Sequence, residues 1–318
     1  MTSAATEPVA GSLVPERRAA WLPALCFLSL GAFTFTPAQA EIAIGEIDPA
    51  ASEDDRIAYG EYVLRAAGCV TCHTAEDGEF LAGGRPIESP FGAFYGPNIT
   101  PDPEYGIGTW SEADFKRALQ EGRSPDGRHY YPAFPFTSYT RMRDEDIEAL
   151  WAFLQSNVDP VAEANRPHEL DWFARFRPAL IGWKWLHFEP GRFEFDPNQS
   201  EQWNRGAYLT HALGHCMECH SPRTRTGGLE LERLGAGTRL PDGDIAPNIT
   251  PDRETGIGRW GERHIARYLE IGITRDGDFA GGSMADVIDH GTSHLTPEDR
   301  QAIASYLRAQ DPIGYEPD

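Results

Sequence analysis

Cys69-Val70-Thr71-Cys72-His73 and Cys216-Met217-Glu218-Cys219-His220 are two copies of one five-residue pattern in this 318-residue chain. Each is a C-x-x-C-H motif, whose two thiols lie one helical turn apart and can each form a thioether with a haem vinyl group. The histidine that follows can offer an imidazole nitrogen to the haem iron. The motifs therefore predict two covalently bound haem c groups, attached through Cys69 and Cys72 and through Cys216 and Cys219, with His73 and His220 as iron ligands.

Other uses of paired cysteines fit the sequence less well. A zinc ribbon places its two C-x-x-C pairs about 15–20 residues apart, whereas these pairs begin at positions 69 and 216. Structural disulfides and a thioredoxin-like pair are the remaining alternatives. Neither accounts for the histidine that ends both motifs, so we expect haem attachment.

Residues 1–40 have the pattern of an export signal peptide. Arg17 and Arg18 form a positive region, residues 21–36 form an apolar stretch, and Ala38-Gln39-Ala40 matches a cleavage site. An uncleaved anchor is the alternative, although this apolar stretch is short for a bilayer span. We expect cleavage near Ala40 and a periplasmic protein that is soluble or peripherally associated with a membrane.

The fifth cysteine, Cys26, lies in this segment, so four cysteines would remain for two haems after cleavage. That count suits an exported protein, in which cysteine thiols are normally bonded and not left free. The formal net charge is −21, and four haem propionates would add to it. Such a charge argues against nucleic acid as a partner and favours basic partners through electrostatic steering, although solubility alone explains it equally well.

A repeat follows each motif at a similar distance. Residues 97–110 (PNITPDPEYGIGTW) and 247–260 (PNITPDRETGIGRW) match at 11 of 14 positions. Gly60-Glu61-Tyr62-Val63 precedes the first motif and Gly206-Ala207-Tyr208-Leu209 precedes the second, where His215 is one extra residue. The chain therefore contains the same unit twice.

Each unit ends on a predicted amphipathic helix, over Asp144–Leu154 and Pro297–Leu307, with apolar residues at helical spacing. Strand patterning is nearly absent, so we predict an all-α fold with long Gly/Pro-rich loops. The predicted domains are 53–158 around haem 1 and 203–312 around haem 2, each of an ordinary domain size.

The connector, residues 159–202, is rich in proline and aromatic residues. This composition does not suit a free linker. We expect the connector to pack across both units and to fix the distance between the haems. The alternative is an exposed apolar patch that binds a partner subunit.

The second axial ligand of each iron is predicted to be methionine, which raises the reduction potential of a c-type haem. Of the four methionines, Met1 lies in the signal and Met217 lies inside a haem motif, which leaves Met284 for haem 2 and Met142 for haem 1. We expect Met284 to lie in a flexible loop. For haem 1, His129 or an open position are alternatives, and Met142 would then be a core side chain.

The repeated Pro-Asn-Ile-Thr loops are predicted to support the iron ligands. A carbonyl of Pro97 or Pro247 can accept the second ring N–H of the histidine and fix its orientation. Trp110 and Trp260 have indole N–H groups suited to haem propionates, and Arg223 could pair with one. The alternative is that the tryptophans are core residues and the prolines only form turns.

Several longer motifs, YPAFPFTSYTRM, WNRGAYLTHALGHCMECHSPR and GGSMADVIDHGTSHLTPEDRQAIASYL, resemble the cytochrome c subunits of periplasmic alcohol, gluconate and aldehyde dehydrogenases. The resemblance covers about residues 55–312 and implies class I cytochrome c-like domains. It also implies a subunit that takes electrons from a dehydrogenase catalytic subunit and passes them to a downstream cytochrome, quinone or oxidase. Many relatives have methionine at the position of Phe134, so the resemblance leaves the distal ligand of haem 1 open.

The leading interpretation is thus an electron carrier without substrate chemistry, and no catalytic side chain is predicted. The alternative is a dihaem enzyme of the peroxidase or thiosulfate dehydrogenase type, with catalysis at haem 1. A haem-based sensor would need an appended signalling domain, and the sequence shows none.

Overall fold

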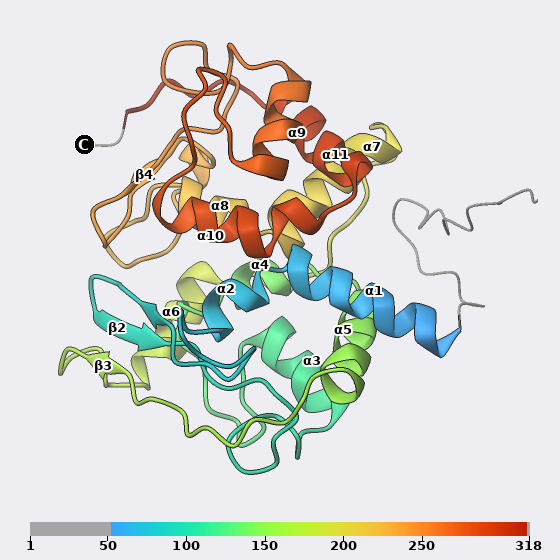
Figure 1. Cartoon of the computed structure of the whole chain (residues 1–318). Coiled ribbons are helices and arrows are strands. Elements are labelled where there is room, and N and C mark those ends of the chain that lie inside the picture. Colours follow the sequence, from blue (N-terminus) through green and yellow to red (C-terminus); the bar gives the residue numbers. More distant parts are fainter. Residues whose placement is uncertain (1–51, 317–318) are drawn as a thin grey trace, which may run out of the picture. The chain divides into compact units, whose positions relative to one another are not determined.

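The computed structural model describes residues 52–316, and helices dominate this part of the chain (Figure 1). The predicted signal peptide, with Cys26, lies outside the described residues. The α-helices of residues 52–316 are α1 (Glu53–Ala66), α2 (Cys69–His73), α3 (Glu112–Glu121), α4 (Phe136–Tyr139), α5 (Asp144–Ser156), α6 (Ala179–His187), α7 (Glu201–Tyr208), α8 (Cys216–His220), α9 (Glu262–Ile271), α10 (Gly282–His290) and α11 (Pro297–Arg308). A π-helix covers Leu209–Leu213, and 3₁₀ turns cover Leu231–Arg233 and Thr292–His294. None of these helices is both long and apolar enough to cross a membrane.

The fold is not purely helical, because short strands lie in the loops. Strands β1 (Pro86–Ile87), β2 (Gly92–Tyr95) and β3 (Glu169–Leu170) form an antiparallel sheet in that order. Strands β4 (Thr238–Arg239) and β5 (Ile245–Ala246) form a second antiparallel pair. The prediction of an all-α fold therefore needs this correction. Strands of two to four residues are too short to leave an alternating pattern in the sequence.

Helix starts are set by side-chain caps. The side chains of Ser52 and Ser111 each accept a hydrogen bond from the backbone N–H three residues later. In return, the carboxylates of Asp55 and Asp114 accept one from the backbone N–H of the cap residue. These capping boxes satisfy N–H groups that have no partner within the helix. The side chain of Thr296 caps α11 by accepting from Asp299 N, without the return bond. The predicted closing helices at 144–154 and 297–307 are confirmed.

In each half of the chain, the helix before the haem motif crosses the last helix of that half. In Figure 1, α1 lies beside α5 and α7 lies beside α11. A Cβ atom at Gly60 would lie 2.1 Å from the carbonyl oxygen of Ala149, and one at Gly206 would lie 2.0 Å from that of Ala302. Only glycine allows both pairs of helices to approach so closely.

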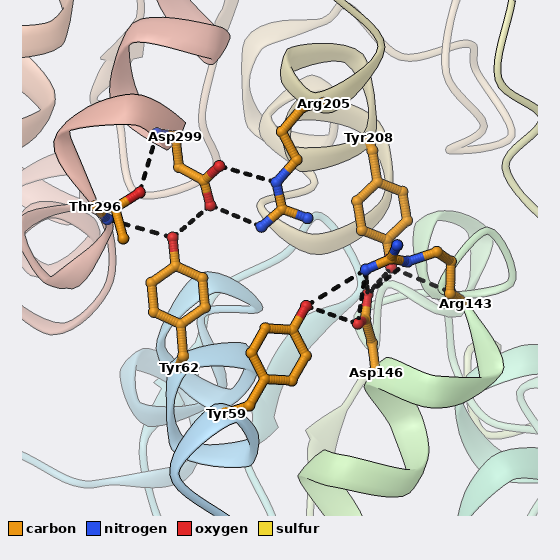
Figure 2. A network of polar contacts seen from close by, with 8 residues as sticks. All are labelled: Tyr59, Tyr62, Arg143, Asp146, Arg205, Tyr208, Thr296 and Asp299. Atoms are coloured by element: carbon orange, nitrogen blue, oxygen red, sulfur yellow. Dashed lines mark hydrogen bonds and ion pairs between the residues drawn. The ribbon is translucent and has the colours of Figure 1, made fainter. Parts of the chain in front are cut away.

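A buried polar network joins these helices across the two halves, as Figure 2 shows. The carboxylate of Asp146 on α5 is fully buried and accepts hydrogen bonds from Tyr59 on α1 (2.8 Å) and from Tyr208 on α7. Arg143 forms an ion pair with the same carboxylate at 3.0 Å. A buried carboxylate is tolerated when it is paired and hydrogen-bonded in this way.

The matching carboxylate in the second half is Asp299 on α11. Arg205 binds it through two parallel hydrogen bonds of 2.8 and 2.7 Å, and Tyr62 on α1 also donates to it. Tyr62 and Tyr208 occupy equivalent positions in the two repeats, and each binds the carboxylate of the opposite half. The two halves are thus joined by a reciprocal pair of buried contacts.

The extra residue of the second repeat is accommodated by the π-helix. Tyr62 is seven positions before Cys69, whereas Tyr208 is eight positions before Cys216. The backbone N–H of Gly214 bonds to the carbonyl of Leu209, five residues earlier, at 2.7 Å. This wider turn takes up one residue without ending the helix.

The connector contacts both halves, as predicted. The side chain of Asn165 accepts a hydrogen bond from Asn98 N in the first half at 2.6 Å. Trp183 on α6 packs against Phe136 of α4, and its indole N–H donates to the carbonyl of Thr226 in the second half at 2.9 Å. Other aromatic side chains of the connector remain exposed.

Candidate haem sites

Both C-x-x-C-H motifs form short helices, α2 and α8. Each begins directly after a residue in the left-handed region, Gly68 (φ +64°) and His215 (φ +37°). In the described part of the chain the four cysteines are free thiols, and no group of three or more His, Cys, Asp and Glu side chains is placed to hold a metal ion. The thiols of each motif are therefore available for thioether bonds to a haem.

The two histidines are held identically. Nδ1 of His73 lies 2.7 Å from the carbonyl oxygen of Pro97, and Nδ1 of His220 lies 2.7 Å from that of Pro247. This confirms the predicted contact of the two proline carbonyls. Because a carbonyl only accepts, Nδ1 must carry the proton, which leaves the Nε2 lone pair of each ring free for iron.

Electrostatics favour the neutral imidazole that iron needs. Burial lowers the pKa of His73, and the hydrogen bond to Pro97 opposes this only in part. The same two causes lower the pKa of His220, with Pro247 as the acceptor. Both rings are thus unprotonated at Nε2 near neutral pH.

The loop that supplies Pro97 packs directly on the first motif. A Cβ atom at Gly96 would lie 1.8 Å from the carbonyl oxygen of Cys72. Asn98 accepts from Thr100 N and donates to the carbonyl of Val161, which ties the loop to the connector. Asn248 has the same role in the second half, where it donates to Ile313. Our sequence analysis missed both asparagines, although they occur at the same place in both repeats.

The thiols of the two motifs have raised pKa values, although Cys69, Cys72 and Cys216 are only half-buried and Cys219 is exposed. Burial is the main reason that the pKa of the Cys69 thiol and the pKa of the Cys216 thiol both rise to about 12. Burial and then the charge of Cys219 raise the pKa of the Cys72 thiol to about 11. A Cβ atom at Gly68, directly before the first motif, would lie 3.4 Å from Nε2 of His215, directly before the second, so the two motifs begin near each other.

Side chains of the first half hold the second motif directly. Glu218, inside α8, accepts hydrogen bonds from Thr137 (2.7 Å) and Ser138 (3.1 Å) of α4. Tyr139 of α4 donates to the carbonyl of Ala67 at 2.6 Å, and its ring packs edge-on against His215. Both motifs are therefore attached to the same short helix. No pattern in the sequence indicated a role for Glu218.

The two candidate methionines lie in different surroundings. Met142 is fully buried in the hydrophobic core, in the turn between α4 and α5. Met284 is partly buried and packs against the same core. It lies in the first turn of α10 and not in the flexible loop that we expected. The alternative ligand His129 has a buried Nδ1 without a hydrogen-bond partner in residues 52–316.

The three residues predicted to contact haem propionates all make other contacts within the protein. Trp110 and Trp260 pack against the hydrophobic core. Arg223 forms an ion pair with Glu218 at 2.8 Å and also donates to the carbonyl of Gly227 at 3.0 Å. Propionate contacts of these three side chains remain a prediction.

The composition of the donor set fits haem c: each motif has two free thiols and a neutral histidine with fixed orientation. Residues 57–157 match the family model described as cytochrome c. The chain is 44% identical to a dihaem cytochrome c-type protein of Cereibacter sphaeroides, over 78% of this chain and 84% of that protein. The chain belongs to the cytochrome c family.

This cytochrome is also similar to larger subunits of dehydrogenases. It is 38% identical to the gluconate 2-dehydrogenase cytochrome c subunit of Pantoea cypripedii, over 84% of this chain and 64% of that subunit. It is 36% identical to the cytochrome c subunit of the quinone-type alcohol dehydrogenase of Gluconobacter oxydans, over 95% of this chain and 62% of that subunit. The chain thus spans less than two thirds of these two relatives. The resemblance stated from the sequence is confirmed, and electron transfer is the activity that the family indicates.

Proposed function

We propose that this cytochrome is a periplasmic two-haem electron carrier built from two tandem class I cytochrome c-like domains. It would accept electrons from the catalytic subunit of a dehydrogenase and deliver them to a downstream cytochrome, quinone or oxidase. The names of the dehydrogenase subunits among its relatives support this partner. The catalytic subunit, and not this chain, would bind the substrate of that dehydrogenase.

Haem c, when bound, supplies a reversible one-electron couple between ferric and ferrous iron. The protein would attach it through Cys69 and Cys72 in the first half and through Cys216 and Cys219 in the second. His73 and His220 would each give Nε2 to an iron. Met142 and Met284 would each supply a thioether sulfur to an iron, and a thioether ligand favours the ferrous state and raises the potential. Trp110, Trp260 and Arg223 are the proposed propionate contacts.

The observation that best supports the proposal is that His73 and His220 are oriented by the same hydrogen bond. Both hydrogen bonds to proline carbonyls are 2.7 Å long, and both loops have the same Pro-Asn-Ile-Thr sequence. A ring that is fixed before the electron arrives needs little rearrangement when the iron changes charge. Fast transfer in both directions needs such preorganisation more than it needs a substrate pocket.

The test is the absorption spectrum of the oxidised and reduced holoprotein, before and after carbon monoxide is added. An electron carrier should have two low-spin, six-coordinate haems, the weak sulfur-to-iron band, and no response to carbon monoxide. Alkaline pyridine would give the number of haems per chain. A high-spin haem, or one that binds carbon monoxide, would instead support a dihaem enzyme with chemistry at haem 1.

A further inference from the structure

The residues that come directly before the two haem motifs lie beside each other. Gly68 and His215 occupy equivalent positions, each at the start of a motif helix and each in the left-handed region. A Cβ atom at Gly68 would lie 3.4 Å from Nε2 of His215 and 3.9 Å from its Cε1. The imidazole of the second motif therefore packs on the backbone that leads into the first motif.

The left-handed backbone at His215 indicates that the ring is needed at this position. Glycine adopts φ +64° at position 68 without a steric cost, whereas His215 has φ +37° and carries a Cβ atom. A residue other than glycine stays in this region only where its surroundings hold it there, and such residues gather at functional sites. His215 is also the one residue by which the second repeat exceeds the first before its motif.

Side chains and backbone of the first half surround the ring. Tyr139 packs edge-on against His215 with ring centroids 5.5 Å apart, and its hydroxyl donates to the carbonyl of Ala67 at 2.6 Å. A Cβ atom at Gly214 would lie 3.4 Å from Sγ of Cys216 and 3.9 Å from the carbonyl oxygen of Ala66. A thiol that would attach haem 2 thus lies close to the end of α1, just before the haem 1 motif.

A second contact links the proposed ligand helix of haem 2 to the first motif. Helix α10, which carries Met284, packs against α2, and the two lie next to each other in Figure 1. Asp286 of α10 also forms an ion pair with Arg85 of the first half. The motif helix α8 and the ligand helix α10 are therefore both fixed to the part of the first half that would hold haem 1.

Electron tunnelling between two haems slows steeply as the distance between their edges grows. Each porphyrin would be tied to its motif by thioethers, so the position of α8 relative to α2 sets that distance. We propose that His215 is a positioning residue that holds the second motif against the first, so that electrons pass directly between the two haems of one chain. One iron is oxidised as the other is reduced, and no further reactant is needed. This role rests on the proposed two-haem function and adds the route between the haems.

The first test measures the distance between the two ferric irons of the holoprotein by pulsed electron paramagnetic resonance. The wild type should give one narrow distance, and His215→Gly should give a longer or broader one. Glycine suits the left-handed backbone and removes only the ring. The matched control is His211→Gln, which removes an imidazole of the same π-helix that bonds to Tyr306 within the second half. It should leave the distance unchanged.

The second test measures internal electron transfer in the same proteins after pulse radiolysis. A phase whose rate does not depend on protein concentration reports transfer within one chain. This phase should be present in the wild type and in His211→Gln and should be slower in His215→Gly. His215→Asn, which tolerates the left-handed region and keeps a planar side chain, should recover part of the rate. Burial lowers the pKa of His215, so the ring is neutral near neutral pH and its removal takes away no charge.

The proposal is overturned if His215→Gly keeps the wild-type iron–iron distance or the wild-type rate. It is also overturned if electrons in the wild type move only between molecules, at a rate that rises with concentration. The absorption spectrum of each variant is recorded with and without carbon monoxide. Two unchanged low-spin haems show that the carrier function and the fold are intact, so loss of internal transfer then concerns His215 alone. A wild-type haem that binds carbon monoxide would instead contradict the electron-carrier proposal.

Discussion

The carboxylate of Glu218 lies 2.8 Å from the guanidinium of Arg223, and the acid belongs to the second C-x-x-C-H motif itself. Its side chain is only 10% exposed. A charge of either sign at this place acts on the haem 2 iron through a medium of low dielectric constant. The pair therefore gives two substitutions that should shift the potential in opposite directions.

Glu218→Gln should raise the midpoint potential of haem 2, because a negative charge stabilises ferric iron more than ferrous iron. Arg223→Gln should lower it. An electrostatic change of about 1 kcal/mol corresponds to about 40 mV for one electron. A redox titration followed at a haem absorption band measures both shifts. The control is Glu53→Gln, at the exposed start of α1, which should leave both potentials unchanged; shifts of equal sign in the two test variants would contradict the argument.

Met142→Leu separates the two possible roles of this buried residue. Leucine has nearly the volume of methionine, so packing should suffer little, but it cannot bind iron. We expect haem 1 to become high-spin or reactive to carbon monoxide while haem 2 is unaffected. Met284→Leu should give the converse result. If the Met142→Leu spectrum equals that of the wild type, Met142 is a core residue and His129 becomes the next candidate.

Gly60→Ala and Gly206→Ala should each destabilise the protein by about 1–3 kcal/mol or more, since the new methyl group meets a backbone carbonyl. The clash distances are 2.1 and 2.0 Å, and a backbone atom cannot rotate away. Urea unfolding monitored by circular dichroism gives the free energy of unfolding. The control is Gly182→Ala in α6, where no atom beyond the adjoining residues and the helix's own backbone lies within 4 Å of the new Cβ. That change should be neutral or slightly stabilising, because alanine favours helix.

Stability should fall in mild acid because of His211. Burial, followed by the positive charge of Arg141, lowers the pKa of His211 from 6.5 to about 4, and its Nε2 lies 2.6 Å from the Tyr306 hydroxyl. Since the pKa is lower in the folded state, protonation favours unfolding. The contribution of His211 is fully present above pH 6.5 and is lost as the pH falls towards 4.

Unfolding by urea at several pH values across this window measures the effect, which is at most about 3 kcal/mol. His211→Gln keeps a hydrogen-bond acceptor for Tyr306 but does not titrate. Its stability should therefore depend less on pH over the same window. An equal pH dependence in the two proteins would rule out His211 as the cause.

The parts of the structure that were predictable from sequence are local. The haem motifs, the closing helices and the proline carbonyls that bond to His73 and His220 all follow from short spacings within a repeat. Repetition helped, since a loop that occurs twice at a similar distance from a haem motif is expected to serve that motif. The ligand assignments beyond the two histidines depend on residue counts and stay predictions.

The parts that could not be predicted depend on distant residues. The bond from Tyr62 to Asp299 joins positions 237 residues apart, and no local pattern indicates it. Met284 was expected in a loop because Gly281, Gly282 and Ser283 precede it. The helix forms nevertheless because α10 packs against α9, and such packing overrides weak propensity.

The π-helix before the second haem motif has a consequence for how the repeat could arise and change. Inserting one residue into an ordinary α-helix would turn every later side chain by about 100°. Here the insertion is confined to Leu209–Leu213, and α7 still crosses α11 at Gly206 as α1 crosses α5 at Gly60. In this segment the second copy is therefore longer than the first by one residue. Deleting His215 would give the second copy the spacing of the first, and would remove the imidazole whose Nε2 lies 3.4 Å from where a Cβ atom at Gly68 would be.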